Sequence, residues 1–285
     1  MNTSGKKDDK IASVRSVFEL TGRVIIITGA AGLLGLRHAE AVAEMGGVPV
    51  LLDLDGAKAQ AAADDLSRRF GVAGIGLAID VTDADAVKAA RETVMSRFGR
   101  IDGLINNAAN NPKVEGSTAN WTRLENFPLD VWAADLAVGL TGAFLCARTF
   151  GEEMARRGRG VILNVASDLA LIAPDQRLYR DSRLPDDQQP VKPVSYSVVK
   201  SGLIGLTRYL CTYWAEQNVR VNAICPGGVF AGQSDEFTQR LNKLIPLGRM
   251  AREDEYQAAI VFLMSDASSY MTGAVISIDG GRSAW

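Results

Sequence analysis

Tyr196 and Lys200, four residues apart, are the residues of this chain whose types and spacing most directly suggest chemistry. In a helix, positions i and i+4 lie on one face, so the two side chains would reach the same place. A phenol ionises at about 10, but a neighbouring ammonium favours the phenolate, and each pKa unit corresponds to about 1.4 kcal/mol. The pair is therefore a candidate for exchanging a proton with a substrate hydroxyl or carbonyl, although helices also carry Tyr and Lys at this spacing by chance.

A glycine-rich segment, TGAAGLLG at 28–35, stands where the first predicted strand turns into the first predicted helix. Its glycines, Gly29, Gly32 and Gly35, allow a tight turn, a close approach of backbone to a pyrophosphate, and packing of helix on sheet. The amino end of the helix then offers N–H donors to phosphates. Without a ligand, the same segment would be only a glycine-rich turn between a strand and a helix.

An acidic residue follows those glycines at the end of the second predicted strand, which reads LLDLD. A carboxylate at Asp53 would accept hydrogen bonds from the ribose hydroxyls of an adenosine and would repel a 2′-phosphate. The next three residues are Leu54, Asp55 and Gly56, with no Arg or Lys among them, so NAD(H) is favoured over NADP(H). Asp55 is an alternative ligand, and a solvated strand end is the interpretation without a ligand.

Short apolar runs alternate with amphipathic segments after Gly22, and these are the elements that must position the residues above. The runs predicted as buried strands are 24–28, 48–52, 74–79, 103–105, 161–165, 220–224 and 274–278, and helical periodicity marks segments such as 34–45, 56–70 and 83–98. Strands that are apolar throughout and separated by helices are typical of a parallel sheet covered on both faces. The predicted fold class is α/β, a single-domain Rossmann-type doubly wound sheet with a crevice at the carboxyl ends of its strands.

Length and composition limit the possible functions. The chain has 285 residues, which suffice for one α/β domain over 18–285 after a polar, poorly ordered tail at 1–17. A net charge of −2 without charged blocks gives no support for nucleic-acid or membrane-surface binding. We find no signal peptide and no run of roughly 18–20 apolar residues.

The cysteines indicate the compartment. Cys146, Cys211 and Cys225 are odd in number and lie in apolar surroundings, which predicts buried, reduced thiols and a cytoplasmic protein. His38 is the single histidine, and no Cys/His set has ligand spacing, so no metal site is expected.

From about Phe18 to the carboxyl end, the chain resembles the short-chain dehydrogenase/reductase family. The segments that carry this resemblance are TGAAGLLG, DVTD at 80–83, NNAA at 106–109, NVAS at 164–167, YSVVK at 196–200, PGGV at 226–229 and TGAVISIDGG at 272–281. The resemblance implies a three-layer fold with about seven parallel strands, a nicotinamide dinucleotide as cofactor, and a homodimer or homotetramer.

The resemblance also implies roles, position by position. Tyr196 would be the general acid/base, Lys200 would lower its pKa and hold the nicotinamide ribose, and Ser167 would hydrogen-bond the substrate oxygen. The positions implied to bind the cofactor are Gly29, Gly32, Leu34, Gly35, Asp53, Asp80, Val81, Asn107, Ala108, Tyr196, Lys200, Pro226, Gly227 and Val229. As alternatives, Asn107 would only tie strand ends together, and Val81 and Val229 would be core residues.

Three features depart from the family pattern. The glycines are spaced GxxGxxG rather than GxxxGxG, a spacing that resembles a longer, nucleotide-sugar-acting branch. Gly139 stands where the family has an Asn that supports a water linking the lysine to solvent, and we expect the space to hold a water or a substrate hydroxyl and to accept an Asn side chain. Ser167 and Tyr196 are 29 positions apart, about twice the usual spacing, because of extra residues in segment 173–194.

Segment 173–194 is rich in Pro, Asp, Gln and Arg. We expect it to lie near the active site and to order over a polar substrate, since its composition gives it little core of its own. The alternative is a surface excursion or an oligomer contact.

These patterns favour an oxidoreductase that transfers a hydride between NAD(H) and a hydroxyl or carbonyl carbon of a small polar substrate. The polar residues of segment 173–194, with Asn110, Asn111 and Lys113, indicate a hydroxylated ligand, and the resemblance extends to sugar- and polyol-acting members, including a branch that acts on surface glycans. One alternative is a sugar epimerase or dehydratase that retains its NAD, which the GxxGxxG spacing motivates. Another is a non-catalytic NAD(H)-binding sensor or scaffold, which Gly139 motivates.

Overall fold

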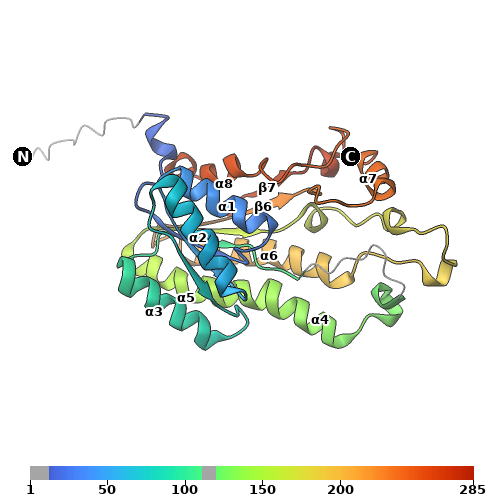
Figure 1. The fold of residues 1–285 in the computed structure, drawn as a ribbon, viewed down its shortest axis with the longest axis horizontal. Coiled ribbons are helices and arrows are strands. Elements are labelled where there is room, and N and C mark those ends of the chain that lie inside the picture. The colour runs from blue at the N-terminus through green and yellow to red at the C-terminus, as the bar shows by residue number, and fades with distance from the viewer. Residues whose placement is uncertain (1–12, 111–119) are drawn as a thin grey trace, which may run out of the picture.

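A single parallel sheet forms the centre of the molecule (Figure 1). The computed structural model describes residues 13–110 and 120–285, and the sheet has the order β3-β2-β1-β4-β5-β6-β7. The strands are β1 Val24–Thr28, β2 Val48–Asp53, β3 Ile75–Ala78, β4 Gly103–Asn106, β5 Gly160–Val165, β6 Val219–Pro226 and β7 Val275–Ile278. The predicted Rossmann-type doubly wound sheet is confirmed, and the seven predicted strands agree with the observed ones to within two residues at each end.

Helices cover both faces of this sheet. Side chains of α1, α2 and α8 pack in the apolar cluster on one face, and those of α3, α5 and α6 pack in the cluster on the other (Figure 1). The helices are α1 Leu33–Glu44, α2 Gly56–Phe70, α3 Ala84–Phe98, α4 Leu129–Leu136, α5 Gly142–Arg157, α6 Val194–Tyr213, α7 Asp235–Asn242 and α8 Gln257–Met264.

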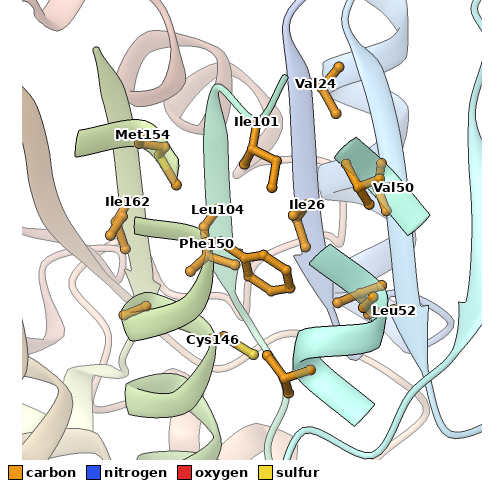
Figure 2. Packing of buried hydrophobic residues seen from close by; sticks show 14 of the residues in the cluster. Val24, Ile26, Val50, Leu52, Ile101, Leu104, Cys146, Phe150, Met154 and Ile162 are labelled. Atoms are coloured by element: carbon orange, nitrogen blue, oxygen red, sulfur yellow. The ribbon is translucent and has the colours of Figure 1, made fainter. Parts of the chain in front are cut away.

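The packing of β1 explains why its residues do not alternate between apolar and polar types. Val24 and Ile26 pack in the cluster of α3, α5 and α6, whereas Ile25 and Ile27 pack in the cluster on the opposite face. Figure 2 shows the first cluster, with the ring of Phe150 from α5 lying against the strands. Because both faces of a central strand are covered, its residues from Val24 to Ile27 are all apolar.

Local signals set the bounds of the helices on either side of β3. Asp55 and Asp83 cap the amino ends of α2 and α3, where their side chains accept hydrogen bonds from backbone N–H groups. Gly71 and Gly99 end these helices in the left-handed conformation. These caps place the two helices as the sequence predicts.

Two expectations from composition are corrected. The helical stretch Leu129–Arg157 is long and apolar enough to cross a membrane by length and composition, although we expected no such run. Its α5 part supplies Phe150 and Met154 to the core against the sheet, which is the place of a core helix.

Cys211 is half-buried rather than buried, while Cys146 and Cys225 are buried, and all three are free thiols. Of the predicted tail, residues 1–12 lie outside the described residues, and a short 3-10 helix, Ser16–Phe18, leads into the domain.

Candidate active site

One pocket of about 720 Å³ opens at the carboxyl ends of the strands. The strand order reverses direction between β1 and β4, and such a switch point is where open α/β sheets bind their ligands. The structure brings all the predicted site residues to this pocket. They are Gly29, Gly32, Leu34, Gly35, Asp53, Asp80, Val81, Asn107, Ala108, Ser167, Tyr196, Lys200, Pro226, Gly227 and Val229.

The turn between β1 and α1 depends on its first and last glycines. Gly29 has φ +60°, and a Cβ there would lie 2.9 Å from the Cα of Ala108. A Cβ on Gly35 would lie 2.3 Å from the carbonyl oxygen of Gly29. Gly32 has an ordinary φ of −80° and precedes α1 without a side-chain cap, so the helix amino end presents backbone N–H groups at the pocket. This arrangement fits the pyrophosphate of a dinucleotide, and the steric need for glycine is greatest at positions 29 and 35.

Asp53 is the better placed of the two acidic candidates. Its Oδ2 accepts a hydrogen bond of 2.9 Å from the backbone N–H of Ala31, which joins the end of β2 to the glycine turn. The carboxylate of Asp55 instead accepts from the backbone N–H of Lys58 at the start of α2. Lys58 also lines the pocket, and the sequence prediction missed it because it lies five positions after Asp53, beyond the three residues on which the preference for NAD(H) was based.

Asn107 and Val81 have structural roles as well as places in the pocket wall, as the alternative interpretations of these residues predicted. Asn107 donates from Nδ2 to the carbonyl oxygens of Thr28 and Gly29, at 2.9 and 3.1 Å, and so ties β4 to the end of β1. Val81 belongs to the apolar core while also lining the pocket. Val229 is half-buried and lies outside the apolar clusters of the described residues.

Ser167, Tyr196 and Lys200 come together at this pocket from two elements. Ser167 follows β5, and Tyr196 and Lys200 lie one turn apart near the start of α6. The ammonium of Lys200 donates to the carbonyl oxygen of Val165 at 2.8 Å, and burial lowers the pKa of this lysine to about 8.

Tyr196 differs from the expectation in one respect. Burial raises the pKa of Tyr196 above its usual value, and hydrogen bonding with Ser167 opposes that rise only in part. Lys200 does not reverse this balance, and its amino nitrogen lies 5.8 Å from the centroid of the tyrosine ring.

A buried ion pair supports Ser167, and no local sequence pattern indicates it. Ser167 Oγ donates to Asp168 Oδ1 at 2.9 Å, and Asp168 Oδ2 pairs with Arg282 Nη1 at 2.7 Å. The side chains of Asp168 and Arg282 are only 4% and 8% exposed. Because they are 114 positions apart, no local spacing could have linked the carboxyl-terminal region to the serine.

Lys192 is a second lysine beside the tyrosine, which the sequence prediction also missed. Its amino nitrogen lies 3.8 Å from the centroid of the Tyr196 ring, and its side chain lines the pocket. Burial lowers the pKa of Lys192 to about 8, while the carboxylates of Asp168 and Asp135 act in the opposite direction. The residue precedes α6, so helical spacing from Tyr196 could not have indicated it.

Gly139 lies in a π-helical stretch, Ala137–Thr141, between α4 and α5. A Cβ here would lie 2.5 Å from a methyl carbon of Val199, so the expectation that Asn would fit is wrong. A small cavity of about 10 Å³ adjoins the glycine and is lined by Tyr196, Lys200, Asn110 and Asp135, among others. A cavity of this size is at the lower limit for one water, and most of its exposed wall is apolar. Asp135 is itself buried and accepts a hydrogen bond of 2.5 Å from Ser195.

Segment 173–194 makes more apolar packing contacts than its polar composition predicted. Leu178 packs with Leu241, Ile245 and Met250 in a small apolar cluster, and the rings of Tyr179 and Phe237 lie 5.6 Å apart. The yellow segment before α6 extends past the sheet at the same end as α7 (Figure 1). The segment brings Leu178, Tyr179 and Lys192 to the pocket, whereas its arginines, Arg177, Arg180 and Arg183, are exposed. Of the polar residues after NNAA, Asn110 lines the pocket, and Asn111 and Lys113 lie outside the described residues.

Comparisons with known proteins agree with this geometry. Residues 23–179 match a family profile described as short chain dehydrogenase, and residues 188–283 match one described as enoyl-(acyl carrier protein) reductase. The chain is 37% identical to D-threitol dehydrogenase of Mycolicibacterium smegmatis, over 94% of this chain and 96% of that protein. It is 34% identical to an NADP-dependent mannitol dehydrogenase of Hypocrea jecorina, over 93% and 94%.

A solved structure is similar throughout. It is a gluconate 5-dehydrogenase from Burkholderia cenocepacia in complex with NADP and tartrate, with a TM-score of 0.82 and 29% identity. The match covers 94% of this chain and 98% of that one.

Proposed function

The chain belongs to the short-chain dehydrogenase family and is an oxidoreductase that acts on CH–OH groups, and on this premise we propose that it is an NAD-dependent dehydrogenase of polyols or related sugars. The observation that carries the proposal is the meeting of Ser167, Tyr196 and Lys200 in the same pocket as the glycine turn and Asp53. A proton-transfer group and a dinucleotide site are thus joined in one cavity.

We assign a separate role in the reaction to each of the three side chains. A bound nicotinamide dinucleotide supplies the hydride acceptor and, when oxidised, a positive charge. In the direction of alcohol oxidation Tyr196 acts as the phenolate, which takes the proton of the substrate hydroxyl and becomes the phenol, and Ser167 holds the same substrate oxygen. Lys200, anchored on the carbonyl of Val165, lies one helical turn from Tyr196, where it would hold the nicotinamide ribose and where its charge would favour the phenolate.

The preference for NAD(H) rests on Asp53. Its carboxylate adjoins the glycine turn, where it would accept hydrogen bonds from the ribose hydroxyls and would repel a 2′-phosphate. Lys58 offers a cation in the same pocket. The mannitol dehydrogenase is named as NADP-dependent, and the gluconate 5-dehydrogenase structure is a complex with NADP. We expect Asp53 to decide the preference, because its carboxylate would act directly on the 2′ position of the adenosine ribose. That position carries a hydroxyl in NAD(H) and a phosphate in NADP(H).

Polyols are the proposed substrates because the threitol and mannitol relatives are named for them and because polar side chains line the catalytic part of the pocket. We also propose a homo-oligomer in the cytoplasm. Apolar side chains are exposed along α5 and α6, as is typical of a protein interface, and the free thiols suit a reducing compartment. The exposed side chains are Phe144, Val198, Tyr209 and Tyr213.

Formation of NADH with a panel of polyols and sugars tests the proposal. We expect net NADH release with at least one polyol, and we expect Tyr196→Phe to lower kcat by about 100-fold or more while NADH still binds. Turnover without net NADH would favour the epimerase, and binding without turnover would favour the sensor. A Tyr196→Phe variant that kept a large share of the wild-type kcat would contradict the proposed mechanism.

A further inference from the structure

A second pocket, of about 280 Å³, lies at the amino ends of the strands, opposite the candidate active site. Arg23, Asp102 and Arg159 line it and directly precede β1, β4 and β5. Arg220, near the start of β6, and Asp266, shortly after α8, complete its charged lining, and we call it the arginine pocket. No described residue lines both this pocket and the larger one, so a ligand here would be separate from the dinucleotide and the substrate.

The carboxylate of Asp266 is shared between two arginines. It accepts from Nη2 of Arg23 at 2.7 Å and from Nη2 of Arg159 at 2.8 Å, and one carboxylate can balance only one of these charges. Within the described part of the chain, Arg159 forms hydrogen bonds through Nη2 alone. A guanidinium has five N–H donors on three nitrogens, so the other two nitrogens of Arg159 can bind a ligand.

The carboxylate of Asp102 is shared in the same way. It pairs with Arg100 at 2.7 Å and with Arg157 at 3.1 Å, and it also accepts a hydrogen bond from the backbone N–H of Val24. Its negative charge is therefore already matched by two guanidiniums outside the lining of the arginine pocket. Asp102 does not offset the positive charge of the arginines that line the pocket.

Arg220 adds a positive charge that no carboxylate neutralises among the described residues. Its guanidinium donates only to neutral oxygens, which are the backbone carbonyls of Leu263, Ser265 and Met271 and the hydroxyl of Ser268. These bonds hold the carboxyl end of α8 against β6, which is a structural role, but they leave the charge in place. A half-buried cation without a counter-ion is costly, so an anion at this pocket would be stabilising.

The arginines of the pocket also repel one another. Burial lowers the pKa of Arg220 to about 10, Asp266 acts in the opposite direction, and the charges of Arg23 and Arg159 add to the fall. All three guanidiniums stay cationic at neutral pH, since arginine ionises at about 12.5 or above in water and Arg220 at about 10 here. An anion that contacted the three groups together would offset this repulsion.

A phosphate group has the chemistry that suits this pocket. It carries about two negative charges near neutral pH and presents three acceptor oxygens from one compact centre, and guanidinium groups bind such oxygens through paired N–H donors. A carboxylate would bring a single charge. The volume of the pocket is slightly below the roughly 300–1,000 Å³ of pockets for drug-sized ligands, so the ligand is small.

We propose that the arginine pocket binds the phosphate group of a small phosphorylated molecule. The inference rests on the charges and contacts of this pocket and is independent of the proposed function.

Pyrophosphate binding in the presence of saturating NADH tests the inference, because NADH occupies the glycine turn and leaves the arginine pocket open. Calorimetric titration gives the affinity for wild type, Arg159→Gln and the matched control Arg156→Gln. Arg156 has the same side-chain exposure as Arg159, 56%, but it pairs with Glu152 on α5 and does not line the pocket. We expect Arg159→Gln to weaken binding by about tenfold and the control to change it by less than about twofold.

The variant Asp266→Asn separates a ligand site from a purely structural ion-pair network. In a ligand site the carboxylate competes with the anion for Arg23 and Arg159, so its removal should tighten pyrophosphate binding by about threefold or more. In a structural network the variant would lose stability and gain no affinity, and that result would overturn the inference. Unfolding midpoints show which variants are folded, and the comparison of Arg159→Gln with Arg156→Gln decides alone if Asp266→Asn is not.

Competition by other anions at equal ionic strength identifies the group that is bound. We expect glycerol phosphate, a phosphate monoester, to displace pyrophosphate, and citrate, whose carboxylates are spread along a carbon chain, to bind at least about tenfold more weakly. Citrate that bound as tightly would overturn the assignment to phosphate. A wild type that binds no pyrophosphate, or an Arg159→Gln variant that binds it as tightly as wild type does, would overturn the site itself.

Discussion

Replacing Arg282 with methionine tests how the carboxyl-terminal region supports the catalytic serine. The variant Arg282→Met leaves the carboxylate of Asp168 buried and without its guanidinium partner, at a site where both side chains are less than a tenth exposed. Breaking a buried ion pair by removing one partner costs about 3–5 kcal/mol, whereas an exposed pair contributes only about 0–1 kcal/mol. The structure places Arg282 and Asp168 in the first class, so we expect the larger loss in the free energy of unfolding.

The chain contains its own control for this experiment. Arg177 pairs with Asp175 at 2.6 Å, but its side chain is 80% exposed, and Arg177→Met should therefore cost no more than about 1 kcal/mol. A domain of this size shifts by roughly 2–4 °C in Tm for each kcal/mol, so we expect a fall of about 6 °C or more for Arg282→Met and at most about 4 °C for the control. The double variant Arg282→Met with Asp168→Asn removes the stranded charge and should recover most of the lost stability.

The assays are thermal unfolding and steady-state kinetics on the polyol with the highest turnover. Because Ser167 donates to Asp168, loss of Arg282 should also lower kcat by about tenfold, or about 1.4 kcal/mol, through a displaced serine. The reasoning is refuted if Arg282→Met is no more destabilising than Arg177→Met, or if the double variant is no more stable than Arg282→Met alone.

Three shorter predictions concern other parts of the protein. Burial lowers the pKa of His38 from 6.5 to about 3, so the stability due to its neutral form is complete above pH 6.5 and is lost as pH falls toward 3. His38→Leu should therefore flatten the acid side of a urea-unfolding profile by up to about 5 kcal/mol, and an unchanged profile would contradict this. Gly139→Ala should lower stability and kcat because its Cβ meets Val199, and adding Val199→Ala should restore both; no restoration would mean that the contact is not the cause. Fluorescence titration should find NADH bound more tightly than NADPH by wild type, and Asp53→Asn should narrow that difference by about tenfold; equal wild-type affinities would refute the preference for NAD.

Local patterns in the sequence determined the fold and much of the candidate site. The apolar runs, the aspartate caps, the positive φ of Gly29 and the close approach of Gly35 to Gly29 depend on close neighbours along the chain or on burial of a whole strand, so they can be read along the chain. The sheet then brings the predicted residues together, since the carboxyl ends of parallel strands share one edge. Ser167, Tyr196 and Lys200 therefore meet where the motifs indicated.

Only the tertiary structure decided the surroundings of that group. The pairing of Asp168 with Arg282 spans the chain, and the place of Lys192 depends on how segment 173–194 folds over α7, because Leu178 of this segment packs against that helix. The direction of the Tyr196 pKa depends on burial, which no residue spacing records. Steric room at Gly139 likewise depends on Val199 of a different helix. Sequence identifies groups that neighbours along the chain or along a strand hold in place, whereas charge balance and free space arise from all the elements that pack around a site.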